Sequence, residues 1–402
     1  MDKRGSKNYF SRERRKPPSQ VSIVRVKNDQ VKEAVEEALN LIGGLPLDLT
    51  AGKKVLVKPN FIRAEPPSIG TTTDFRLIKA VIEILKDKEV EILVGEASGN
   101  QYDTEEIYQF LKVRDFLPDA EIADLDQEEI ISVQIEGAKA LKEVGIARRA
   151  LEADFIISLP ILKTHNATLI TLGLKNMMGV LPQREKWKMH LSGLHQALVD
   201  LNRVVKPDLV IIDGIIGQEG LGPTMGKPVE MNLIIAGFDA VAVDSVGSEV
   251  MGISPSEVKH LVLAEKDGLG HSNLKEIIVL GEKIEDVKRP FKRPIGKIFF
   301  YLTGIIQYKI GRFLLTKFNY DIRPFLKSFS SFHLPKPKLI KKLCQAKKRC
   351  IEICPKGAIS FQSYPRIDYK KCNGCMLCYE QCPEKAYKIS RYPKWWLRLT
   401  VK

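Results

Sequence analysis

The chain has 402 residues, 44% of them hydrophobic, and a formal net charge of +14. This length and hydrophobic content support a large α/β domain plus a smaller appended domain. All seven cysteines lie between positions 344 and 382, a distribution that excludes a secreted disulfide scaffold and favours the reducing cytoplasm.

The charge is divided unevenly along the chain. Residues 288–402 hold 27 Lys and Arg against 5 Asp and Glu, whereas residues 1–287 hold 36 against 44. The sequence therefore predicts an acidic body followed by a basic C-terminal third. Residues 1–19 are basic and lack the apolar run of a signal peptide, so we expect a disordered leader.

Residues 20–285 alternate between short β-rich runs and helical patterns. We predict strands at 21–26, 54–58, 90–96, 154–160, 208–214, 231–237 and 277–281. We predict helices at 31–42, 74–87, 194–205 and 239–252. Runs of Val, Ile and Leu without polar alternation are typical of strands covered on both faces. The pattern predicts a three-layer α/β body with a mainly parallel sheet.

Residues 286–340 and the tail 391–402 combine basic with aromatic side chains, and three interpretations stay open. The first is a linker helix whose lysines are solvated. The second is a peripheral contact with an anionic membrane through residues 288–343 and 391–402, since this mixture suits a lipid surface. Nucleic-acid binding is the least favoured, because no recognition module accompanies the charge.

Residues 341–390 hold two cysteine runs that each end in Cys-Pro, the pattern of a two-cluster bacterial ferredoxin and a small α+β fold. In that pattern the fourth cysteine of each run ligates the other cluster. One [4Fe–4S] cluster is therefore expected on Cys354, Cys372, Cys375 and Cys378.

The second cluster site has only three cysteines, because Lys347 stands at the position of the fourth. Cys344, Cys350 and Cys382 remain at ligand spacing. We expect this site to hold a [3Fe–4S] cluster, or a [4Fe–4S] cluster with a non-cysteine ligand, with an empty site as the alternative.

Polar side chains gather where the predicted strands end. In open parallel sheets, ligands bind outside the carboxyl ends of the strands. The candidates for catalysis are Lys58, Glu96, Lys163, His165 and Asp213. The candidates for substrate binding are Asn60, Ser98, Asn166, Lys175, Asn176, His190, His195 and Glu219. Taken singly, each has a structural explanation, such as a helix cap for Asn60 or a turn for Asp213.

Several stretches resemble a family of domains of unknown function, number 362. They include VLVKPN, VGEASG, LPILKTHNATLITLGLKNMMGVLP and PDLVIIDGIIGQEGLGPTMGKP, and the resemblance covers roughly residues 50–250. Members are often fused to a C-terminal ferredoxin module, as here. The resemblance implies an architecture but no established reaction.

We expect an iron–sulfur oxidoreductase or electron-transfer protein, whose clusters exchange electrons with chemistry in the α/β body. Lysines, His165 and Asn166 would bind an anionic substrate or cofactor, while Glu96 and Asp213 would handle protons or a metal. The basic C-terminal third would dock an acidic redox partner or an anionic membrane. The alternative is a non-catalytic binding or assembly protein with structural or regulatory clusters. We expect a cytoplasmic location, with membrane association as a further alternative.

Overall fold

A computed structural model describes residues 18–99, 103–294, 335–352, 354, 356–369, 371–372, 377–380 and 382–391. The predicted leader and tail, and most of the basic aromatic segment, lie outside the described residues. Within the described part, no helix is long and apolar enough to span a membrane.

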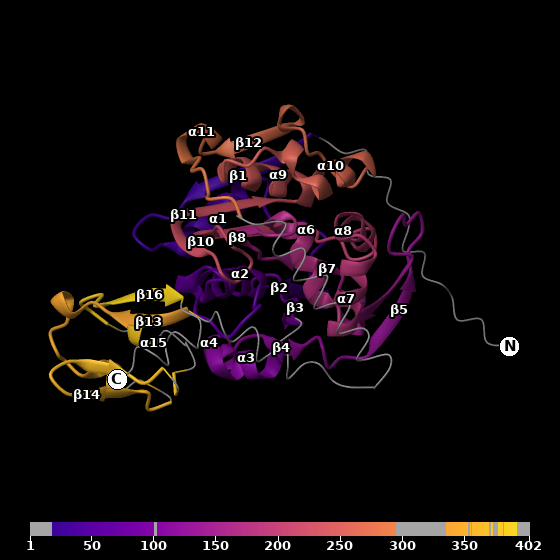
Figure 1. Cartoon of the computed structure of the whole chain (residues 1–402). Coiled ribbons are helices and arrows are strands. Elements are labelled where there is room, and N and C mark those ends of the chain that lie inside the picture. The colour runs from indigo at the N-terminus through magenta and orange to yellow at the C-terminus, as the bar shows by residue number, and fades with distance from the viewer. Residues whose placement is uncertain are drawn as a thin grey trace.

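The body is built around one large sheet (Figure 1). Its main path runs β12 (Ile277–Gly281), β1 (Ser19–Arg25), β11 (Lys227–Gly237), β10 (Leu209–Glu219), β7 (Phe155–Ser158), β2 (Lys54–Lys58), β3 (Glu91–Glu96) and β4 (Glu121–Asp124). β8 (Ile161–His165) pairs with β10 and with β9 (Leu169–Thr171). β11 runs antiparallel to both of its neighbours, and the other pairs along the main path are parallel. The mainly parallel α/β sheet predicted from the sequence is confirmed.

Helices cover both faces of this sheet. They are α1 (Val31–Leu41), α2 (Phe75–Lys86), α3 (Thr104–Leu111), α4 (Val113–Phe116), α5 (Arg148–Glu152), α6 (Gly173–Asn176), α7 (Gln183–Leu191), α8 (Leu194–Leu201), α9 (Ala240–Val250), α10 (Lys259–Lys266) and α11 (Ile284–Val287). Short 3-10 turns lie at Pro67–Ile69, Met177–Val180, Pro255–Glu257 and Leu274–Glu276. A separate hairpin pairs β5 (Ile130–Gln134) with β6 (Glu143–Ala147).

Alternate residues of β2 face opposite sides of the sheet, and each side packs against its own layer of helices. Val55 and Val57 of β2 belong to the core shared with α1 and α2, whereas Leu56 belongs to the core shared with α8. A strand whose two faces are both buried needs a run of apolar residues, which is the pattern of Val55, Leu56 and Val57 at the centre of KVLVK. The sheet and its two helical layers thus follow directly from these runs.

Two strands near the centre differ from the sequence prediction. β10 does not end at residue 214 but continues through Asp213 to Glu219, and then pairs back along β11. The polar stretch after β7 is itself a buried strand, β8, which carries Lys163 and His165. Glu219 is therefore a strand residue, not a residue of a loop beyond a strand end, and Asp213 lies within the strand, not near its end.

The body also extends beyond the predicted boundary at 285. Phe291 is 5% exposed and joins the core formed by α9 and α10. The backbone N–H of Lys292 donates to the Glu219 carboxylate at 2.9 Å, which attaches this segment to the end of β10.

The C-terminal module has two small antiparallel sheets. β13 (Pro335–Leu339) pairs with β16 (Tyr387–Arg391), and β14 (Ile359–Phe361) pairs with β15 (Pro365–Ile367). Between them lie a 3-10 turn (Lys341–Leu343), α14 (Arg349–Glu352) and α15 (Leu377–Glu380). The small α+β module predicted from the sequence is confirmed, and its strands start at residue 335, ahead of the predicted 341.

Candidate functional site

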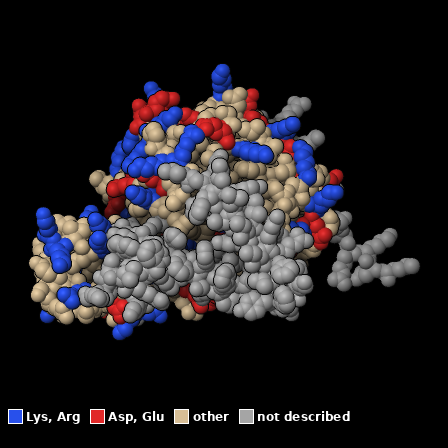
Figure 2. Space-filling model, in the orientation of Figure 1, with Lys and Arg blue, Asp and Glu red and all other residues tan. Residues whose placement is uncertain are grey.

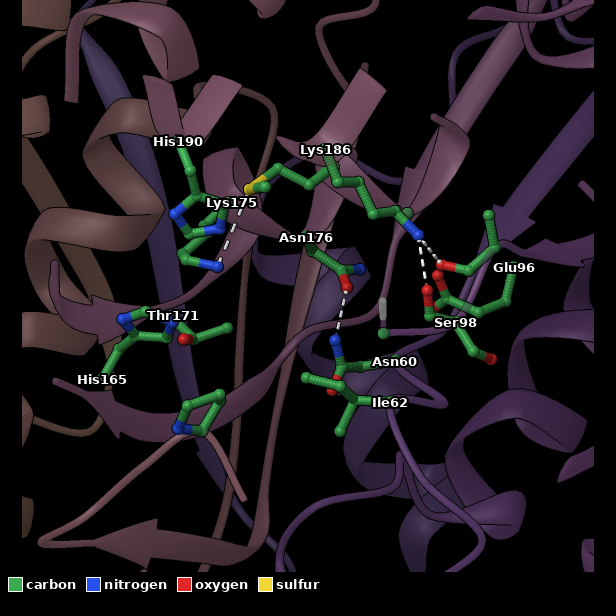
Figure 3. A pocket seen from close by; sticks show the side chains of 15 residues that line it. Asn60, Ile62, Glu96, Ser98, His165, Thr171, Lys175, Asn176, Lys186 and His190 are labelled. Carbon is green, nitrogen blue, oxygen red and sulfur yellow. Dashed lines mark hydrogen bonds between the residues drawn. The ribbon is translucent and has the colours of Figure 1, made fainter. Parts of the chain in front are cut away.

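One polar pocket in the body collects most of the predicted site residues. It has a volume of about 180 Å³ and lies where β2, β3 and β8 end. Its lining includes Asn60, Glu96, Ser98, His165, Thr171, Lys175, Asn176, Lys186 and His190. Figure 3 shows these side chains in two groups, with His165, Thr171, Lys175 and His190 on one side and Glu96, Ser98 and the Lys186 ammonium on the other.

A buried ion pair forms the acidic end of the pocket. Lys58 Nζ lies 2.8 Å from Glu96 Oε2, and both side chains are almost fully buried. The same oxygen accepts the backbone N–H of Phe61 at 3.1 Å. Burial lowers the pKa of Lys58, while Glu96 opposes that shift. The fixed carboxylate therefore keeps Lys58 charged more readily than burial alone would allow.

Gly179 makes this arrangement sterically possible. A Cβ atom at this position would lie 2.0 Å from Glu96 Oε1 and 2.4 Å from Lys58 Nζ. The peptide of Gly179 also contacts the next strand end, because its carbonyl accepts the backbone N–H of Ala97 at 2.7 Å. Only glycine fits so close to the ion pair.

Two asparagines connect the pocket wall to Lys163. Lys163 Nζ donates to Asn60 Oδ1 at 2.6 Å, and Asn60 Nδ2 donates to Asn176 Oδ1 at 3.0 Å. Asn176 Nδ2 in turn donates to the Lys58 carbonyl at 2.9 Å. Burial, with a further contribution from Lys175, lowers the pKa of Lys163 to about 7. Lys163 thus stands behind the lining and orients Asn60.

Lys186 reaches the pocket from α7. Its ammonium donates to the carbonyls of Ala97 (2.5 Å) and Ser98 (2.6 Å), just beyond β3. Burial lowers the pKa of Lys186 to about 8, against the attraction of Asp126. Lys186 was not among the predicted site residues, because it lies in a polar helix, QREKWKMHL, and not at a strand end.

Lys175 lies on the opposite side, on the four-residue helix α6. Asp244 holds the start of this helix by accepting the N–H groups of Gly173 (2.6 Å) and Leu174 (2.9 Å). A helix this short has little stability of its own, so the buried carboxylate fixes its position. Burial, and then Lys186, lower the pKa of Lys175 to about 8.

Four predicted site residues have other surroundings in the structure. Asp213 accepts the backbone N–H groups of Asp74 (2.7 Å) and Ile215 (3.0 Å), which is a structural role. His195 faces His260, with ring centroids 6.0 Å apart. Glu219 binds Lys292, and the backbone N–H of Asn166 donates to the Gly222 carbonyl. None of the four is among the described residues that line the pocket.

In the C-terminal module the two cysteine runs show the same local geometry. The backbone N–H of Ala358 donates to Cys354 Sγ at 3.3 Å, and that of Ala386 donates to Cys382 Sγ at 3.4 Å. Each alanine lies four residues after its cysteine. Hydrogen bonds of this kind to cysteine sulfur are among the protein's means of tuning an iron–sulfur cluster.

The three cysteines of the predicted second site lie near one another. Burial raises the pKa of the Cys350 thiol, and Cys344 and Cys382 raise it further. Lys347, at the vacant ligand position, makes an ion pair of 2.6 Å with Glu384. Across the described residues, no three His, Cys, Asp or Glu side chains have metal-site geometry, and Cys375 lies outside them. The donor types fit iron–sulfur clusters, and the two ligand sets stay predictions.

Comparison with known proteins identifies both parts of the chain. The model of the family "Domain of unknown function (DUF362)" matches residues 55–249, and that of the "4Fe-4S binding domain" matches residues 365–388. The chain joins a DUF362 domain to a ferredoxin-type 4Fe–4S domain. This confirms the fusion inferred from the sequence and makes the chain an iron–sulfur protein. The matched 4Fe–4S region contains Cys372, Cys375, Cys378 and Cys382 and leaves out the first cysteine run.

Two individual proteins are similar to this DUF362 protein. The thylakoid-associated protein sll1697 of Synechocystis is 26% identical over 275 residues, which is 63% of this chain and 82% of that protein. The solved lactate racemase apoprotein from Thermoanaerobacterium thermosaccharolyticum is 14% identical, with a TM-score of 0.40. That match covers 58% of this chain and 57% of the other, and the likeness is too weak to bear on function.

Proposed function

We propose that this DUF362 protein is an iron–sulfur oxidoreductase or electron-transfer protein. Its C-terminal clusters would exchange electrons with an anionic substrate or cofactor bound in the pocket of the body. The observation that carries the proposal is the convergence of Glu96 with residues of α6 and α7 around one cavity, where Lys58 and Lys163 bind the lining residues Glu96 and Asn60 from behind. Structural polar residues would not be expected to gather in this way.

The charge of the pocket supports an anionic ligand. Glu96 is engaged by Lys58, whereas Lys163 and Lys186 have neutral oxygens as their hydrogen-bond partners among the described residues. A buried ammonium without a carboxylate partner is costly, because it has lost its hydration. An anion in the cavity would offset that cost.

The surface of the C-terminal module supports an acidic redox partner. Eleven of its described Lys and Arg side chains are exposed, against one exposed carboxylate, Glu352. Basic side chains are visible on this module in Figure 2. The exposed basic residues are Lys338, Lys341, Lys342, Lys347, Lys348, Arg349, Lys356, Arg366, Lys371, Lys385 and Lys388. A peripheral contact with an anionic membrane uses the same chemistry, and the similar protein described as thylakoid-associated agrees with it.

The test is redox coupling between pocket and clusters. Protein purified anaerobically would be analysed for iron, reduced with dithionite, and followed by cluster absorbance and EPR while co-purifying or candidate small anions are added. We expect a ligand to reoxidise the reduced clusters or to shift their reduction potential. The shift should be lost in Lys163→Ala and His165→Ala.

The exposed Lys79 of α2 gives the matched control, and Lys79→Ala should behave as the wild type. Full iron content in every variant would show that the clusters are intact. Ligand binding without any redox response would contradict the proposal and support a non-catalytic binding protein instead.

A further inference from the structure

The end of the pocket opposite Glu96 contains an unsatisfied hydroxyl group. Thr171, at the end of β9, is 4% exposed, lines the cavity, and has no hydrogen-bond partner for Oγ1 among the described residues. A buried hydroxyl without a partner destabilises a protein, so native structures rarely contain one without a reason. A ligand in the cavity would supply the missing acceptor.

His165 presents a second donor at this end. Its Nδ1 accepts the backbone N–H groups of Ala167 (3.0 Å) and Thr168 (3.3 Å), which places the proton of the neutral ring on Nε2. Burial lowers the pKa of His165 well below its usual value, and Lys175 lowers it further. The neutral ring therefore offers the cavity an N–H group.

Lys175 supplies a third donor. Its ammonium has one hydrogen-bond contact within the described chain, Met178 Sδ at 3.7 Å, and makes no ion pair there. The titratable groups around it are His165 and Lys163 of β8, His190 and Lys186 of α7, and His260 of α10. All of these are neutral or positive, so none of the described groups around Lys175 compensates its charge, and an anion from outside would do so.

We propose that His165, Thr171 and Lys175 form a subsite for one oxyanion group, a carboxylate or a phosphate, of the small molecule that enters the pocket. This inference deepens the proposed function and rests on it for the identity of the pocket. An N–H, an O–H and an ammonium from three different elements match the several acceptor oxygens of such a group. The cavity of about 180 Å³ suits a small metabolite.

The experiment measures equilibrium binding to the full-length, anaerobically purified protein, and no electron flow is needed. Inorganic phosphate and oxalate would be titrated separately by calorimetry at pH 7 and constant ionic strength, with chloride as the reference anion. We expect one of the two to bind with a dissociation constant in the millimolar range or below. The stronger probe identifies the group that the subsite takes.

Variants test each donor. Thr171→Val keeps the shape of the side chain and should weaken binding roughly fivefold to tenfold, while Thr171→Ser should restore it. Lys175→Met should weaken binding by more than about thirtyfold, and Lys79→Ala should change nothing. Thr171→Val should also raise the melting temperature of the ligand-free protein, because it removes an unpaired buried hydroxyl.

Proton uptake provides an independent signature. Because an anion favours charged Lys175, binding at pH 8 should take up protons, measured as a dependence of the binding enthalpy on buffer ionisation. Absence of binding by both probes, or equal binding by wild type, Thr171→Val and Lys175→Met, would overturn the subsite. Intact binding without any effect on the clusters would overturn the redox proposal and leave the subsite standing.

Discussion

At the scale of single residues, the pocket depends on groups that are costly to bury. The ion pair between Lys58 and Glu96 is fully enclosed, and Gly179 packs directly against it. Replacing one partner of such a pair leaves an uncompensated charge, which is far more damaging than replacing both. The geometry of this end is therefore sensitive to very small changes in shape.

We expect Gly179→Ala to disrupt this end of the pocket. The added methyl group would lie 2.0 Å from Glu96 Oε1, so the carboxylate or the strand must shift. Overpacking of this kind lowers the free energy of unfolding by about 1–3 kcal/mol. Chemical denaturation would measure the loss, and anion titration should show weaker binding. Unchanged stability and unchanged binding would show that the contact is relieved without consequence.

The buried lysines predict an unusual pH dependence. The pKa is lowered from 10.5 to about 7 for Lys163 and to about 8 for Lys175 and Lys186, so between pH 7.5 and 9.5 the unfolded chain binds more protons than the folded chain. The free energy of unfolding of the ligand-free protein should therefore rise with pH in this window, by on the order of 2–4 kcal/mol per pH unit.

Two buried carboxylates act in the opposite direction, but at lower pH. The pKa values of Asp213 and Asp244 are raised by burial to about 7, so their contribution to stability falls as pH rises from about 4 to 7 and changes little above that. Denaturation curves at pH 7.5, 8.5 and 9.5 would isolate the lysines. Lys163→Met should flatten the slope, whereas Lys79→Met should preserve it; a flat wild-type profile would contradict the assignment.

At the scale of elements, the sequence predicted apolar strands well and polar strands poorly. β2 and β12 have the predicted bounds, because both contain an uninterrupted run of Val, Leu or Ile. β8 was missed because LKTH contains three polar residues, which a sequence pattern assigns to a loop. In the structure their partners come from distant segments, such as Asn60 for Lys163, and a single sequence cannot show such partners.

The same limit explains the incorrect end of β10. The polar Asp213 led to the prediction that the strand ends at residue 214. In the structure its carboxylate accepts two backbone N–H groups, and the strand continues across a register shift between Gly214 and Ile216. A bulge accommodates such an interruption without ending the strand. Thr171 and Lys186 were missed for a related reason, since neither follows a strongly apolar strand.

In the C-terminal module, Lys347→Cys is expected to complete the second cysteine set. It restores C-x2-C-x2-C-x3-C and removes the ion pair with Glu384. The iron content per chain should rise, and any [3Fe–4S] EPR signal of the oxidised wild type should disappear.

Lys348→Cys is the matched control, because it adds a thiol one residue out of register and should not raise the iron content. Equal iron in wild type and Lys347→Cys would mean that the second site holds either a full cluster or none. EPR of the reduced wild type would then distinguish these two states.

At the scale of the whole molecule, the sequence predicted architecture more reliably than site composition. The three-layer body and the small C-terminal module follow from hydrophobic runs and cysteine spacing, which are local properties. The pocket collects residues from β3, β8, β9, α6, α7 and the segment that follows β2. Nine of the thirteen predicted body residues line it or contact a residue that does, and the remaining four serve packing and backbone contacts.

The uneven charge leads to a prediction about reaction partners. The exposed basic residues of the C-terminal module should favour anionic electron acceptors over cationic ones. We expect ferricyanide to oxidise the reduced protein faster than its driving force alone predicts, with a rate that falls as salt is added, because screening shortens the Debye length to about 8 Å near physiological ionic strength. Cobalt(III) hexaammine should show the opposite salt dependence.

Stopped-flow absorbance of the clusters would measure both rates. A control with a neutral quinone should be nearly insensitive to salt. Identical salt dependence for the anionic and the cationic acceptor would contradict electrostatic steering by this surface.

The ion pair between Lys347 and Glu384 also affects how this chain can change over generations. Lysine and cysteine codons differ at every base, so the lost ligand cannot return by a single nucleotide change. Every route also passes through at least one codon that encodes neither lysine nor arginine, and that intermediate would leave the nearly buried Glu384 without its cation, beside Cys382. Selection against these intermediates should therefore preserve the three-cysteine form of the second set. Descendants of this chain should keep Lys347 and Glu384 together or lose both.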